Sequence, residues 1–177
     1  VLSDKSTMQQ FETGIGTIMA DNICFPAKLV HGHIYDLVAK KVDRIFMPYV
    51  VFEKKDDKET VNSYNCPIVT AYSDVIKSAI DPAQKFGIPV DAPTLTFANK
   101  KLMKKACREY LLSLMPDLSL SAINNAFNNA LKAQREYELA LNHRSKEILN
   151  KAVAENRLVI LLAGRPYHID PLIQHKI

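Results

Sequence analysis

The sequence has 177 residues, 47% of them hydrophobic, and its 23 Lys and Arg against 19 Asp and Glu give a formal net charge of +4. A chain of this size can bury a core, and its dispersed charge forms no basic stripe with interleaved aromatic residues, which disfavours nucleic-acid binding. Its three cysteines, an odd number, favour a reducing compartment over a disulfide scaffold. No apolar run approaches the roughly 20 residues that span a membrane, so we expect a cytoplasmic protein that is not membrane-bound.

Two helices are predicted at the start of the chain. Ser6 and Gln9 stand at the two positions of a capping box, which indicates a short helix from about residue 6. A longer helix is predicted over 26–41, where Pro26 suits the first turn and Asp21 or Asn22 can cap. One face of that helix is apolar at the helical spacing, and it comprises Val30, Ile34, Leu37 and Val38.

A thiol and two basic side chains surround the start of the longer helix. Cys24 directly precedes it, so exposed amides and the positive end of the helix dipole would favour a thiolate. Lys28 and His31 are three residues apart on one face, and we expect both to point towards Cys24. His33 is about 200° around the helix from His31, so the two cannot chelate one metal from one face. The alternative that Cys24 is a small buried apolar residue stays open.

Three apolar runs are predicted as strands. Residues 45–52 are typical of a strand covered on both faces, with pairing interrupted at Pro48. Residues 68–72 follow as a second strand, residues 81–98 are expected to be an irregular, proline-rich connection, and residues 158–163 form the strongest parallel-strand pattern. The alternation with helices predicts an α/β fold with an open, mainly parallel sheet and flanking helices, a Rossmann-like lobe.

Three further helices are predicted between these runs. Ser73 should cap a short helix over 74–80. A second helix starts at Lys100 and is stopped by Pro116. The third, over 121–154, would be about 50 Å long, a length typical of a helix that bridges two lobes. Its alternating charges favour a solvated face over a binding site.

The predicted organisation has three parts. Residues 1–98 form a first α/β lobe that carries two cysteine motifs. Residues 99–155 form a helical segment with the long bridging helix, and residues 156–177 form the start of a second, truncated α/β lobe. The chain opens on Val1 rather than Met, which suggests a domain of a longer protein.

The loop after the last predicted strand is a candidate ligand site. It has the sequence GRPYHIDP over 164–171, and ligands of open α/β sheets lie beyond the carboxyl ends of strands. Arg165 is suited to grip a phosphate or carboxylate. Equally open is that Arg165 and His168 merely tie the loop to the long helix. Asp170 as a cap would begin another helix.

The cysteines are the candidate metal ligands. Cys24 and Cys66 both lie at element boundaries with a proline close behind, and two soft ligands suit iron–sulfur or zinc. Two cysteines complete neither site, so the remaining ligand would come from missing chain, a partner subunit, His31 or His33. Cys107 is predicted in the core of a helix face. No phosphate-binding loop and no nucleophile-elbow motif is present in the sequence.

Three motifs together resemble a known family. They are CFPAKLVHGH over 24–33, NCPIVT over 65–70 and GRPYHIDP over 164–171. They look like the CoA-substrate-specific enzyme activase-related proteins, which are relatives of 2-hydroxyacyl-CoA dehydratase components and of the 2-hydroxyglutaryl-CoA dehydratase activator. The resemblance implies a domain behind two activator-type ATPase repeats in a cytoplasmic protein of anaerobes. In related dehydratase subunits three cysteines hold an iron–sulfur cluster between two α/β lobes.

By the same resemblance, Cys24 and Cys66 would be the first two ligands of a [4Fe–4S] cluster, which we expect in the full-length protein and not in this piece alone. The third cysteine of the family would lie in the second lobe. From their positions near Cys24 and in the 164–171 loop, and not from the resemblance, the candidate catalytic residues are Lys28, His31, Arg165 and His168. Lys176 departs from the family pattern, where we would expect Gly.

The resemblance also implies partners and leaves the activity open. An activator-type ATPase, in the same chain or separate, would deliver single electrons, and the substrate would be an acyl-CoA; a homodimer is an open alternative. No ATPase signature is present in this sequence, so we expect no ATP hydrolysis by it. The competing interpretations are a non-catalytic docking or scaffold domain with structural cysteines, and a zinc-binding domain.

Overall fold

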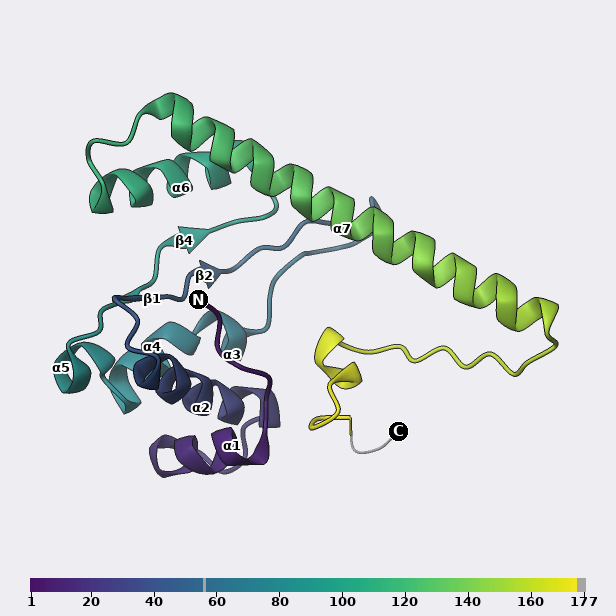
Figure 1. Ribbon diagram of the computed structural model, residues 1–177, viewed down its shortest axis with the longest axis horizontal. Helices are drawn as coiled ribbons and strands as arrows, with labels where there is room; N and C mark the ends of the chain where they lie inside the picture. The colour runs from purple at the N-terminus through teal and green to yellow at the C-terminus, as the bar shows by residue number, and fades with distance from the viewer. Residues whose placement is uncertain (56, 175–177) are drawn as a thin grey trace. The chain divides into compact units, whose positions relative to one another are not determined.

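The computed structural model describes residues 1–55 and 57–174 (Figure 1), so the family departure at Lys176 lies outside the described residues. The chain divides into two compact units, Val1–Cys107 with the segment that begins at Pro166, and Arg108–Arg165. The elements are α1 (Met8–Gly14), η1 (Ile15–Thr17), α2 (Phe25–Ala39), β1 (Ile45–Phe46), β2 (Tyr49–Val50), α3 (Pro67–Thr70), α4 (Tyr72–Ala79), α5 (Pro82–Phe86), β3 (Val90–Asp91), β4 (Thr94–Leu95), α6 (Lys100–Leu114), α7 (Leu120–Ala154) and η2 (Pro166–Ile169).

The strands pair in parallel, as the alternation of elements predicts. β1 pairs with β3, with Ile45 opposite Val90, and β2 pairs with β4, with Tyr49 opposite Thr94. The break between β1 and β2 falls at Pro48, because proline has no amide to donate to a ladder. The mixed α/β class is therefore confirmed, with two short parallel sheets of two strands each in the described residues.

The predicted strand over 68–72 is wrong. Ile68 and Val69 lie in α3, and Tyr72 begins α4. The proline at position 67 occupies the first turn of α3, where its fixed φ suits a helix and its missing N–H costs nothing. That local preference outweighs the β propensity of the apolar run.

The prediction of an irregular connection over 81–98 is also wrong, because this segment contains α5, β3 and β4. Each of the two strands is only two residues long. A strand so short shows no alternation in the sequence, and its partner lies far away along the chain.

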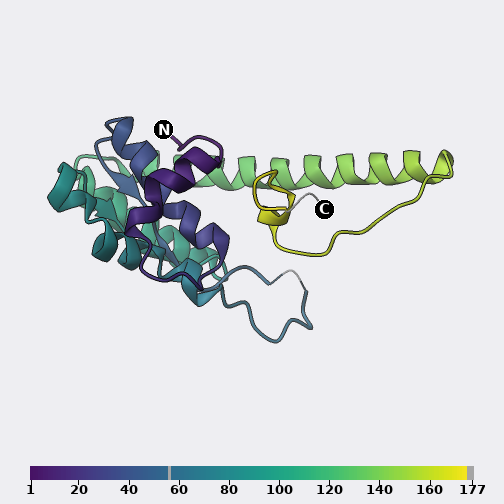
Figure 2. The ribbon, with the colours of Figure 1, turned by 90° about the horizontal axis from the view of Figure 1, so that it is seen from below.

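The predicted strand over 158–163 is not formed in the described residues. The backbone there has no regular secondary structure, and the side chain of Leu161 is 89% exposed. Figure 2 shows this segment as extended chain after the end of α7. An apolar run becomes a parallel strand only where a neighbouring strand accepts its hydrogen bonds, and no described strand lies beside this one.

Most helix predictions are confirmed. α2 and α6 match the predicted helices, and α7 is one continuous helix of 35 residues capped by Ser119 (Figure 2). α1 is capped one residue later than predicted, by a capping box of Thr7 and Gln10. The charged residues of α7 are exposed and form ion pairs along the helix, such as Lys132–Glu136. This agrees with the prediction that they mark a solvated face.

Two predicted caps are wrong. Ser73 lies inside α4, not before it, because the helix continues from Ala71 without a side-chain cap. Asp170 accepts a hydrogen bond from the amide of Leu172, at 2.8 Å, and closes a turn in place of a helix. No helix in the described part of the chain combines the length and apolarity needed to cross a bilayer.

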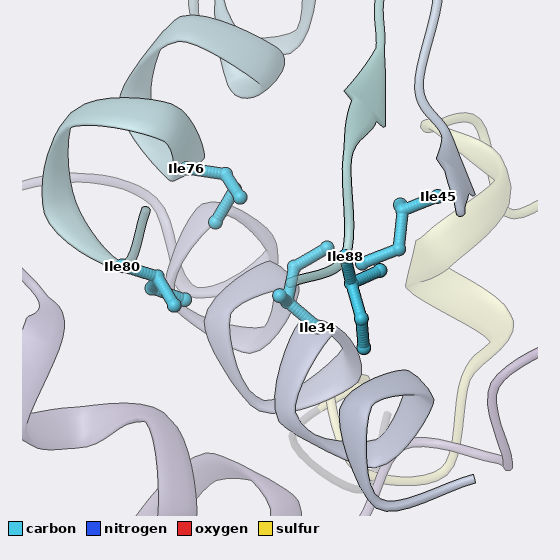
Figure 3. Packing of buried hydrophobic residues seen from close by; sticks show 5 residues of the cluster. All are labelled: Ile34, Ile45, Ile76, Ile80 and Ile88. Carbon is cyan, nitrogen blue, oxygen red and sulfur yellow. The ribbon is translucent and has the colours of Figure 1, made fainter. Parts of the chain in front are cut away.

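The core of the first unit is built from isoleucines (Figure 3). Side chains from α2, β1, α4 and the adjoining loops point towards one another. Burying each such side chain stabilises the fold by about 1.5–3 kcal/mol. The cluster comprises Ile34, Ile45, Ile76, Ile80 and Ile88.

α1 and α2 pack with their backbones in close approach. A Cβ atom on Gly14 would lie 2.5 Å from the backbone nitrogen of Gly32, and one on Gly32 would overlap the carbonyl oxygen of Gln10. Both glycines are therefore required by packing. This contact fixes the N-terminal segment against the helix that follows Cys24.

Candidate thiol site

Two cysteines occupy equivalent positions at helix starts. Cys24 is the N-cap of α2, with φ −61° and ψ 146°, and Cys66 is the N-cap of α3, with φ −60° and ψ 130°. The cap role is played by the backbone, because the Cys24 carbonyl accepts from the amide of Ala27 at 3.0 Å. In the described structure neither thiol forms a capping hydrogen bond or a disulfide.

Tyr72 is influenced electrostatically by both thiols. This residue begins α4 and is half-buried. Burial, together with the charges of the neighbouring Cys24, Cys66 and Tyr167, raises the pKa of Tyr72 to about 12. Negative charge on a nearby thiol disfavours a phenolate. Both thiols therefore lie close enough to one phenol to act on its ionisation.

The loop over 164–171 reaches this neighbourhood through Tyr167. The Tyr167 ring lies edge-on to the ring of His168, with centroids 4.7 Å apart, and Tyr167 acts on the pKa of Tyr72. His168 is half-buried. Arg165 is exposed and belongs to the other unit, so its catalytic role stays a prediction.

The two basic residues near Cys24 have structural contacts. Lys28 donates from Nζ to the carbonyl oxygen of Asp21, at 2.6 Å, which fixes the turn before α2. His31 is 1% exposed, and its Nδ1 lies 2.9 Å from Oγ1 of Thr17. Burial lowers the pKa of His31, because a buried imidazolium loses its hydration.

His33 is held through both ring nitrogens. Oγ of Ser3 lies 2.8 Å from Nδ1, and Oγ of Ser6 lies 3.0 Å from Nε2. Burial lowers the pKa of His33, while the nearby Asp36 and Asp170 oppose that shift. This ring therefore ties the N-terminal segment to α2, and its nitrogens are occupied by hydroxyl groups.

An apolar pocket adjoins the thiols. It has a volume of about 360 Å³. The residue before Cys24 and the residue after Cys66 both line it. The lining comprises Met19, Ala20, Ile23, Ala27, Val30, His31, Pro67, Ile68, Ala71, Tyr72, Val75 and Ile76.

The described residues contain no complete metal site. Among them no group of three or more His, Cys, Asp or Glu side chains is arranged to hold a metal ion. Cys24 and Cys66 fit two ligands of an iron–sulfur cluster by donor type and by their shared neighbour Tyr72. Cys107 is half-buried on α6, and burial raises the pKa of its thiol, which disfavours a thiolate there.

Sequence reasoning missed Tyr72 and the pocket. Both depend on α3 and α4, which were predicted in part as a strand. The signal was present in the sequence, since Pro67 follows Cys66 much as Pro26 follows Cys24. Reading Pro67 as a first-turn proline would have predicted a helix and placed Tyr72 just beyond it.

Comparison with known proteins identifies the family. No curated protein and no solved structure matches the chain. A family model described as CoA enzyme activase uncharacterised domain (DUF2229) matches residues 1–177, and it confirms the resemblance of the three motifs. The match covers the whole chain, and the protein therefore belongs to this CoA enzyme activase domain family.

Proposed function

We propose that this domain supplies two ligands, Cys24 and Cys66, to an iron–sulfur cluster of the [4Fe–4S] type in an activase-related protein. The cluster would accept low-potential electrons from an activator-type ATPase and pass them to a CoA-thioester substrate. The observation that carries this proposal is the position of both thiols at helix N-caps, those of α2 and α3, with both acting on the pKa of the same residue, Tyr72. The family supports an activase-related role.

The surroundings of Cys24 favour a negatively charged ligand. It stands at the N-terminus of a helix of 15 residues, where unpaired amides and the helix dipole stabilise anions. It is also exposed, so a cluster can reach it without the core opening. Tyr72 keeps its proton, since its pKa is about 12, and can donate a hydrogen bond at the site.

The remaining ligands of the cluster would come from residues other than Cys24 and Cys66. A third cysteine in a second α/β lobe, another part of the same protein or a second copy could provide them. In this proposal residues 1–98 are a Rossmann-like lobe, residues 99–155 bridge the lobes, and residues 156–177 open the second one. The whole would work in the cytoplasm of an anaerobe.

Four residues are proposed to serve the reaction. Lys28 would provide positive charge near Cys24 and His31, which burial favours as the neutral ring, a group for proton transfer, while Arg165 and His168 would bind an anionic group of the substrate. The cluster, when bound, supplies one-electron chemistry. The chain's own residues orient the substrate and hold protons.

The test is cluster assembly in the anaerobically prepared full-length protein. Iron content, visible absorption and electron paramagnetic resonance are compared for the wild type, Cys24→Ser, Cys66→Ser and the control Cys107→Ser. We expect the first two variants to lose the cluster signal and the control to keep it. Retained signal in both variants contradicts the proposal.

Two other outcomes identify the competing functions. Stoichiometric zinc without iron, lost on Cys24→Ser, would indicate a zinc-binding domain. Absence of metal together with binding to the ATPase that both variants retain would indicate a docking domain with structural cysteines. Either result overturns the cluster assignment.

A further inference from the structure

The apolar pocket of the first unit has the size of a small-molecule site. Its volume of about 360 Å³ lies within the range of about 300–1,000 Å³ that is usual for ligand pockets. A closed apolar cavity of about 150 Å³ already holds a molecule of benzene. The pocket is therefore large enough for a hydrocarbon group of about six carbon atoms or more.

The pocket can be entered from solvent. Its lining comes from the segment before α2 and from α2, α3 and α4. Among the lining side chains, Met19 is 75% exposed and Val75 is 37% exposed, whereas Ile76 is fully buried. The wall thus runs from the surface to the core of the first unit, and a ligand can enter without unfolding of that core.

The surface of the pocket is almost entirely apolar. Ten of its twelve lining residues are Ala, Ile, Val, Met or Pro, and the other two are His31 and Tyr72. The Nδ1 atom of His31 already lies 2.9 Å from Oγ1 of Thr17. Because so little of the surface is polar, the two rings contribute mainly carbon atoms to it.

Such a surface favours a hydrocarbon group over any polar one. A charged group or a hydroxyl group that entered the pocket would lose its hydration without gaining a hydrogen-bond partner, which is unfavourable. A methylene group has no such hydration to lose, and its full burial is worth about fourfold in affinity. The polar part of a ligand must therefore stay outside the pocket.

We infer that this pocket binds the hydrocarbon chain of a small amphiphilic molecule and leaves the polar end of that molecule outside, in solvent. The inference does not rest on the proposed cluster, because neither Cys24 nor Cys66 is among the lining residues. It does bring a ligand close to both thiols, since Ile23 and Pro67 of the lining are their direct neighbours in the chain.

The first experiment titrates the full chain with uncharged probes: 1-butanol, 1-hexanol, 1-octanol and hexane-1,6-diol. Methyl NMR follows the signals of Ile23, Ile68 and Val75. We expect saturable shifts, and an affinity that rises about two- to fourfold per methylene from 1-butanol to 1-hexanol. The diol should bind at least about fivefold more weakly than 1-hexanol, because its chain carries a second hydroxyl group into the apolar wall.

Three outcomes of this titration overturn the inference. The first is the absence of saturable shifts at these methyl groups, and the second is an affinity that does not depend on chain length or on the second hydroxyl group. The third is a shift of the same methyl signals when the protein alone is diluted, which would show that a second copy fills the pocket.

The second experiment uses variants. Ala71→Leu adds bulk to the lining and should weaken 1-hexanol binding at least about tenfold. Ile68→Ala removes part of the wall at a position that is 39% exposed, so the fold is kept, and binding should weaken at least about threefold. The control Ala39→Leu, at an exposed position of α2, should bind as the wild type does. Wild-type affinity in Ile68→Ala, or in a folded Ala71→Leu, places the probe elsewhere and overturns the inference.

Discussion

The burial of His31 makes the stability of the first unit depend on pH. Its pKa in the folded state is lowered from the usual value near 6.5. The unfolded chain therefore binds more protons than the folded one once the pH falls below that value. The stabilisation by neutral His31 is complete above the unfolded pKa and is lost as the pH falls towards the folded pKa.

We predict that the contribution of His31 to the free energy of unfolding is constant above about pH 7.5 and falls below about pH 6.5. One histidine contributes a slope of at most about 1.4 kcal/mol per pH unit. His33 acts in the same direction, partly offset by Asp36 and Asp170. Urea unfolding at several pH values measures the slope.

The matched variants for this prediction are His31→Gln and His143→Gln. Glutamine at position 31 can still bond to Thr17 but does not titrate, so the slope should become shallower. His143 is exposed on α7, and its replacement should leave the slope as in the wild type. An unchanged slope in His31→Gln would mean that this ring is hydrated in the folded protein.

At the scale of elements, the contact of α1 with α2 depends on glycine. We predict that Gly32→Ala lowers the free energy of unfolding by about 3 kcal/mol or more, because the added methyl overlaps the backbone of Gln10. Backbone atoms cannot rotate away as a flexible side chain can. Chemical denaturation measures the change.

The control for Gly32 is Gly16→Ala. Nothing lies within 4 Å of a Cβ atom at Gly16, so this change should stay within about 0.5 kcal/mol of the wild type. Similar stability of the two variants would show that α1 is not packed on α2 in solution.

The apolar residues 158–163, after α7, are either an exposed segment or a buried strand, and a substitution there distinguishes the two. Its side chains are exposed, so Leu161→Lys should change the free energy of unfolding by less than about 0.5 kcal/mol. Ile80→Ala, in the core, should cost about 2–5 kcal/mol. If Leu161→Lys costs as much as Ile80→Ala, the run is a buried strand after all.

Sequence patterns predicted the elements that local signals define. α2, α6 and α7 follow from apolar spacing, a cap such as Ser119 and a stop such as Pro116. The strands β3 and β4 could not be predicted, because two-residue strands arise from pairing with distant chain. Residues 158–163 show the opposite case. Their β propensity is high, but no strand lies beside them in the described structure, and the segment is an exposed coil.

At the scale of the whole molecule, the candidate site was predicted by residue type and missed in its surroundings. The equivalent cap positions of Cys24 and Cys66 follow from the neighbouring prolines. Tyr72 comes within electrostatic range of both because α4 begins directly after α3. The hydrogen bond from Lys28 to the Asp21 carbonyl likewise depends on the conformation of the loop before α2. Hydrophobic periodicity in the sequence carries no information about that conformation.

Folding of the first unit should not depend on a metal. Its buried cluster consists of isoleucines, and Cys24 is exposed while Cys66 is half-buried. Replacing both thiols by hydroxyl groups removes little buried apolar surface, so the double variant Cys24→Ser/Cys66→Ser should lose no more than about 1 kcal/mol. A chelator should leave the thermal unfolding midpoint of the wild type unchanged, because its core is stabilised by apolar burial.

Ile76→Ala, at a fully buried position of the same cluster, is the reference variant, with an expected loss of about 2–5 kcal/mol. Unfolding of the wild type by the chelator, or a loss in the double variant as large as in Ile76→Ala, would mean that bound metal contributes to the fold itself, as it does in proteins that fold only around their metal.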